Sequence, residues 1–76
     1  MNGNIKRLLI CLPNQPNLCG IFTLEDAKSL ANEKCPDQSK VVSIMELDNN
    51  DVISCLERND GDWIEKEVRR LVFNNH

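Results

Sequence analysis

Four clusters of turn-forming residues divide this chain into short segments, and this division limits the folds that it can adopt. The clusters are rich in Pro, Asn, Asp and Gly, and they lie at residues 13–17, 36–37, 48–51 and 59–61. These residue types favour turns because they impose or tolerate backbone angles that strands and helices do not use. With 76 residues in total, we expect one domain over residues 1–76, built from short elements around one modest core.

Three segments have the composition of β-strands. Residues 5–12 form an apolar run that ends at a turn cluster, and residues 41–47 begin with β-branched side chains and alternate between two faces. Residues 18–22 (LCGIF) are β-prone but are interrupted by Gly20. For this third segment, a return strand with a bulge and an ordered approach to the next helix are both open interpretations.

Residues 52–58 (VISCLER) also admit two interpretations. As a strand, they would alternate between two faces, and residues 48–51 would form a hairpin loop. As a helix, they would be capped by Asp48 and would gather their apolar side chains on one face. We prefer the strand, because the segment is short for a helix and ends in a second turn cluster.

Two segments have helical patterns. Thr23 has the character of an N-cap before residues 24–34, where apolar side chains recur at spacings of three and four. Asp62 and Glu65 have the spacing of a capping box at the start of a second helix, residues 63–73. The predicted fold is therefore α+β, with two helices packed on one face of a three- or four-stranded, mainly antiparallel sheet, in the order β-(β)-α-β-β-α.

The acidic residues are concentrated in one window. Residues 46–67 contain eight acids and two bases, a net charge of −6, whereas the rest of the chain contains four acids and seven bases. Such asymmetry indicates an acidic surface that a partner recognises. The predicted partner-binding residues are six acids of this window and its one Trp: Glu46, Glu57, Asp60, Asp62, Trp63, Glu65 and Glu67. Trp63 is either an exposed hot spot or a packed side chain, and the scarcity of aromatic residues favours packing.

The sequence does not combine the residue types that catalysis or metal binding requires. The one His is residue 76, Tyr is absent, and the acidic turns lack the ligand spacing of a calcium loop. The four cysteines, Cys11, Cys19, Cys35 and Cys55, form no CxxC pair. We expect them to be reduced apolar side chains, with Cys19 the most exposed, and we expect no catalytic residues, no metal and no cofactor.

These features favour a small non-enzymatic protein-interaction or regulatory module, such as an inhibitor or a nucleic-acid mimic, with an acidic surface for a protein partner. The alternative is a thiol-dependent redox or metal-responsive protein that uses two or more cysteines. A pI near 5.0 argues against direct nucleic-acid binding. The chain lacks both a signal-peptide pattern and a long apolar run, so we expect a cytoplasmic protein without membrane contact. An exposed sheet edge would allow a homodimer.

Overall fold

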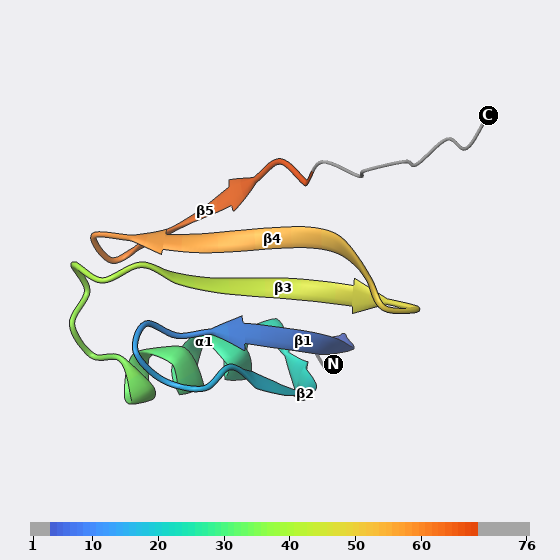
Figure 1. Ribbon diagram of the computed structural model, residues 1–76, viewed down its shortest axis with the longest axis horizontal. Helices are drawn as coiled ribbons and strands as arrows, with labels where there is room; N and C mark the ends of the chain where they lie inside the picture. The colour runs from blue at the N-terminus through green and yellow to red at the C-terminus, as the bar shows by residue number, and fades with distance from the viewer. Residues whose placement is uncertain (1–3, 69–76) are drawn as a thin grey trace.

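A computed structural model describes residues 4–68 of the chain. Within this range, five strands form one antiparallel sheet, and one helix packs on one of its faces (Figure 1). Across the sheet, the strands lie in the order β2-β1-β3-β4-β5. The elements in chain order are β1 (Ile5–Cys11), β2 (Leu18–Thr23), α1 (Leu24–Lys34), β3 (Val42–Asp48), β4 (Asp51–Asn59) and β5 (Asp62–Lys66).

Strands β1, β3 and β4 lie where the sequence predicts them, and β2 decides between the two interpretations that the sequence left open. Residues 18–23 form the return strand β2, which pairs with β1 along its whole length. Residues 51–59 form the strand β4 and not a helix. Asn49 and Asn50 explain this outcome, because both have positive φ angles (52° and 69°). Two such residues form the type I′ turn that suits the twist of a hairpin, and Asn tolerates this conformation.

The helix α1 has the predicted bounds and buries the predicted stripe. The Thr23 hydroxyl accepts a hydrogen bond from the backbone N–H of Asp26 at 3.1 Å, which caps the helix. Ala27 and Ala31 have no exposed surface, and they pack with the aliphatic side chains of β1 and β3. Among the described elements, the backbone of α1 lies close to β1, β2 and β3, and α1 reaches β4 only through a hydrogen bond between Asn32 and Arg58. The helix therefore covers only one half of its face of the sheet (Figure 1).

The prediction of a second helix, and with it a sheet of three or four strands, is wrong. Residues 62–66 form β5, which pairs antiparallel with β4, whereas residues 69–73 of the predicted helix lie outside the described residues. Asp60 and Gly61 both have positive φ angles (50° and 88°), so they form the two-residue loop of a second hairpin. A helix of this length is marginal in water without packing, since isolated helices need about 12 to 15 residues. Backbone pairing with β4 therefore outweighs the capping box.

A buried arginine fixes the connection between α1 and β3. Arg58, on β4, has no exposed surface. Its guanidinium donates hydrogen bonds to Asn32 Oδ1 at 2.8 Å and to the carbonyl oxygens of Cys35 at 2.8 Å, Asp37 at 2.8 Å and Lys40 at 3.0 Å. These acceptors lie at and just after the C-terminal end of α1, where the partial charge is negative and favours a cation. Residues 35–40 are thereby held over this end of β4.

Strand alternation divides the side chains of the sheet between two faces. We call the face that α1 covers the helix side, and the opposite face the open side. The register places Ile10, Ile44 and Leu56 in one row on the helix side, because Ile44 pairs with both of its neighbours. The same register places Leu9, Met45 and Cys55 in one row on the open side.

Candidate functional site

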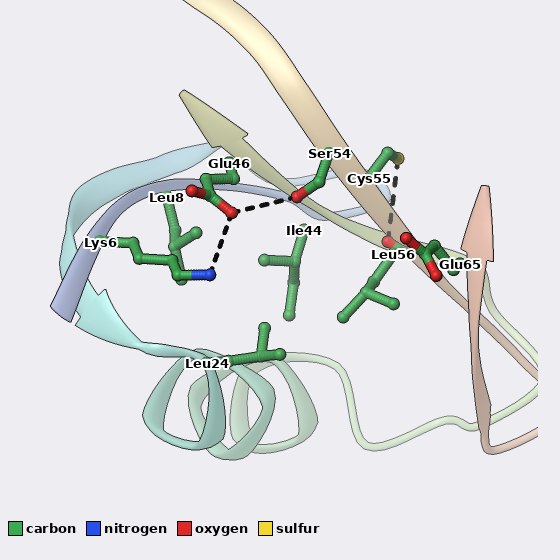
Figure 2. Close-up of a pocket in the computed structure, with 9 residues that line it drawn as sticks. All are labelled: Lys6, Leu8, Leu24, Ile44, Glu46, Ser54, Cys55, Leu56 and Glu65. Carbon is green, nitrogen blue, oxygen red and sulfur yellow. Dashed lines mark hydrogen bonds and ion pairs between the residues drawn. The ribbon is translucent and has the colours of Figure 1, made fainter. Parts of the chain in front are cut away.

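A pocket lies on the helix side, where α1 leaves the sheet uncovered (Figure 2). Its volume is about 250 Å³. Strands β1, β3, β4 and β5 and the first residue of α1 all contribute to its lining. The lining residues are Lys6, Leu8, Leu24, Ile44, Glu46, Ser54, Cys55, Leu56 and Glu65.

The floor of the pocket is aliphatic. Leu8, Ile44 and Leu56 lie on the neighbouring strands β1, β3 and β4, and Leu24 of α1 projects toward them (Figure 2). Leu8 and Ile44 are each 2% exposed, so this floor is continuous with the core. Leu56 is only half-buried because the backbone of α1 lies over β1, β2 and β3 and not over β4. The site therefore offers part of the core surface to an apolar group from outside.

Two carboxylates border this aliphatic floor. Glu46 Oε1 accepts hydrogen bonds from Lys6 Nζ at 3.2 Å and from Ser54 Oγ at 3.3 Å. Glu65, on β5, is exposed, and its side chain has no ion pair or hydrogen bond within residues 4–68. The positive charge of Lys6 offsets the negative charge of Glu46. The residues that line the pocket therefore carry one net negative charge, which comes from Glu65.

The strand alternation divides the predicted partner-binding residues between the two faces of the sheet. Glu46 and Glu65 lie on the helix side and line the pocket. Glu57 and Asp62 lie on the open side. The other three lie in the β4–β5 turn, on the helix side of β5 and just after β5: Asp60, Trp63 and Glu67. The structure thus brings two of the seven residues together in the pocket and does not unite all seven on one surface.

The prediction that Trp63 is packed is confirmed. Its side chain is half-buried and contacts the hydrophobic core. Trp63 pairs with Arg58 in the β4–β5 register, at the end of the hairpin that residues 35–40 cover. The ring of Trp63 therefore lies at the end of the helix side that residues 35–40 cover. The pocket near Ser54 lies at the other, uncovered end of the same face.

On the open side, Glu57 is an acid with partners inside the chain. Asn59 Nδ2 donates a hydrogen bond to Glu57 Oε1 at 3.0 Å, and Lys66 Nζ lies 3.6 Å from the same oxygen. The hydrogen bond from Asn59, followed by the charge of Lys66, holds the pKa of the Glu57 carboxyl below its usual range. This carboxylate is already satisfied, so it is a weaker candidate for partner recognition than Glu65.

Replacing Asn59 with Ala is expected to raise the pKa of Glu57 toward its ordinary value. Because folding lowers this pKa, the stabilisation from Glu57 is complete above the ordinary Glu pKa of about 4.3 and is lost as the pH falls through the lowered value. An NMR titration of the Glu57 carboxyl carbon measures the midpoint. Asn17→Ala, at an exposed position before β2, is the control. A midpoint that Asn59→Ala leaves unchanged contradicts the assigned cause.

All four cysteines are free thiols. Cys19 is exposed, as predicted, and Cys35 is buried. Burial raises the pKa of the Cys11 and Cys55 thiols, and the Glu57 carboxylate raises that of Cys55 further. A raised pKa keeps a thiol protonated at neutral pH, and the protonated form is a poor nucleophile and metal ligand. Within residues 4–68, no three His, Cys, Asp or Glu side chains are grouped to hold a metal ion.

Comparison with known proteins does not place the chain in a family. No family model matches it, and neither the curated proteins nor the solved structures give a significant match. In the part of the chain that the structure describes, no helix is long and apolar enough to cross a membrane. Any functional assignment therefore depends on the geometry of the pocket and of the sheet.

Sequence reasoning identified the two carboxylates of the pocket but not the residues between them. Lys6 comes to the site through the pairing of β1 with β3, Ser54 and Leu56 through the β3–β4 hairpin, and Leu24 through the packing of α1. One local signal was present for Glu46, which shares its strand face with Val42 and Ile44. A carboxylate in line with two core residues indicates a polar group at the edge of the core.

Proposed function

We propose that this protein is a small, non-enzymatic binding module that receives a basic amphipathic helix of a partner protein on the uncovered part of its helix side. One observation carries the proposal: an aliphatic floor and two carboxylates occur in one pocket, and Glu65 has no partner within residues 4–68. The floor favours apolar side chains of the partner. The carboxylate of Glu65, which no base of residues 4–68 offsets, favours Lys or Arg at the edge of the same contact.

The dimensions of the site favour a peptide over a small molecule. A pocket of about 250 Å³ is smaller than the roughly 300–1,000 Å³ of typical small-molecule sites. Strands β4 and β5 extend the sheet by about 10 Å beyond β3, at roughly 4.8 Å per strand. Packed helices lie about 8–10 Å apart. A partner helix beside α1 therefore matches the uncovered width, and Leu24 and Leu56 are the side chains that it would contact.

The two other hypotheses receive less support from the geometry. A nucleic-acid mimic needs its acids on one surface, whereas Glu46 and Glu57 lie on opposite faces of β3 and β4. A thiol-dependent function needs thiolates, whereas burial raises the pKa of Cys11 and Cys55. The interaction module is the function that the described residues support best.

Calorimetric titration with two designed helical peptides tests the proposal. The peptides share one apolar face, and the polar face carries Lys and Arg in one and Glu in the other. We expect the basic peptide to bind and the acidic peptide not to bind, because the pocket is bordered by carboxylates. Equal affinity for both peptides, or binding of neither, contradicts the proposal.

Two substitutions locate the binding in the pocket. Glu65→Lys is expected to lower the affinity for the basic peptide by about tenfold, because it replaces an attraction with a repulsion. Leu56→Ala is expected to lower the same affinity by at least about fivefold, because it truncates an apolar contact at the centre of the interface. Glu33→Lys makes the same charge change on an exposed residue of α1 and is the matched control. A loss of affinity that is equal in Glu33→Lys and Glu65→Lys points to net charge alone.

A further inference from the structure

The open side of the sheet has the composition of a surface that is buried. One row of side chains crosses all five strands, and four of its five members are apolar: Cys19, Leu9, Met45, Cys55 and Lys66. Ile21, in the next row on β2, is 72% exposed. An antiparallel sheet with one face in water normally places polar side chains on that face. This sheet departs from that pattern.

No described element covers this face. The one helix within residues 4–68 lies on the helix side, and Figure 1 shows the strands forming a single layer beyond it. Charged side chains occur toward the margins of the open side, where Glu57 and Lys66 form an ion pair at 3.6 Å. The apolar row and the charged margin together resemble the core and rim of a protein interface.

We propose that the open side binds a second copy of this chain, sheet against sheet, in a two-fold symmetric dimer. β3 is the central strand of the five. A two-fold axis along β3 therefore places the β1–β2 half of one copy over the β4–β5 half of the other, and Met45 meets its own counterpart at the centre. An apolar surface is complementary to itself, which an isologous interface requires.

The area of the face fits a dimer. Five strands span about 24 Å at 4.8 Å each, and seven residues span about 23 Å at 3.3 Å each, so the face projects to roughly 550 Å². This projected area is close to the roughly 600 Å² that each partner buries at the lower end of specific interfaces. Sheets in such sandwiches lie about 10 Å apart, which leaves room for Leu9 and Met45 to interdigitate.

Sedimentation equilibrium of the full chain tests this proposal. We expect a dimer, with twice the chain mass of 8.7 kDa. Met45→Glu is expected to raise the dimer dissociation constant by at least about tenfold, because the carboxylate would be buried without a partner. Ser29→Glu, which adds the same charge at an exposed residue of α1 on the opposite face of the sheet, should leave the constant unchanged. If circular dichroism shows that Met45→Glu is unfolded, Ile21→Glu replaces it, since a residue 72% exposed contributes little to the monomer.

Thiol accessibility gives a second readout. In the dimer, Cys11 and Cys55 of the open side are sealed, so their rate of alkylation should fall as the concentration of wild-type protein rises. In the variant that disrupts the dimer, the rate should not depend on concentration. A wild-type protein that sediments as a monomer at every concentration overturns the proposal and assigns the open side to a different occupant. The peptide site lies on the opposite face, so this result leaves the proposed function unaffected.

Discussion

Replacing Arg58 with Met is expected to destabilise the fold by about 2–4 kcal/mol, because the substitution removes the donor of several hydrogen bonds to neutral acceptors. Methionine fills a similar space but donates no hydrogen bond. The carbonyl oxygens of Cys35, Asp37 and Lys40 would lose the donors that they have at 2.8, 2.8 and 3.0 Å. The buried acceptor of Cys35 costs about 1–3 kcal/mol when it is left unpaired, and the part-buried acceptors of Asp37 and Lys40 cost less because water can reach them. The connection over β4 therefore depends on this one guanidinium.

Urea denaturation followed by Trp63 fluorescence measures this loss. A destabilisation of about 3 kcal/mol should also lower the melting temperature by roughly 12 °C or more in a domain of this size. Arg58→Lys retains the charge but has fewer donors, so an intermediate loss is expected. Lys34→Met, at an exposed residue of α1, is the control and should change stability by less than about 0.5 kcal/mol. A loss below about 1 kcal/mol in Arg58→Met contradicts the role assigned to Arg58.

Val42→Ala is expected to destabilise the protein by about 2 kcal/mol, whereas Val41→Ala should have little effect. Val42 has no exposed surface, and Val41 is 47% exposed. Each buried methylene contributes about 0.8 kcal/mol, and the remaining cavity adds to the loss. The two substitutions are identical and adjacent, so they differ in burial alone: Val42 begins β3 and faces the core, whereas Val41 precedes the strand and is exposed. A shift of one residue in strand register would exchange these faces.

Unfolding in urea, run in parallel on the two variants, tests this facing directly. The midpoint for Val42→Ala should fall well below that of the wild type, and the midpoint for Val41→Ala should remain close to it. Equal losses in the two variants would show that β3 does not present one face to the core.

The parts of the fold that depend on local signals could be predicted from the sequence. The cap at Thr23 and the stripe around Ala27 fix α1, and the alternation in residues 41–47 fixes β3. Residues 62–66 could not be assigned in this way, because two local signals compete around them. The pair Asp60 and Gly61 specifies a hairpin, and the capping box after it specifies a helix. The partner strand β4 decides between them through backbone pairing, which is a tertiary effect.

The candidate site was less predictable than the fold. The acidic window pointed to Glu46 and Glu65, but the sequence alone does not show that alternation separates Glu57 from them. The role of Arg58 also has no local signal, since its acceptors come from residues 18 to 26 positions earlier in the chain. Contacts of this kind exist only once β4 lies beside β3, so they follow from the sheet order and not from any motif.

Amide chemical-shift mapping with the basic helical peptide tests the central claim most directly, namely that the uncovered part of the helix side is the binding surface. The predicted result is that the largest shifts occur at Leu24, Ser54, Leu56 and Glu65, with little change at Cys19 and Ile21 on the open side. Shifts confined to the open side, or spread evenly over all acidic residues, would contradict this assignment.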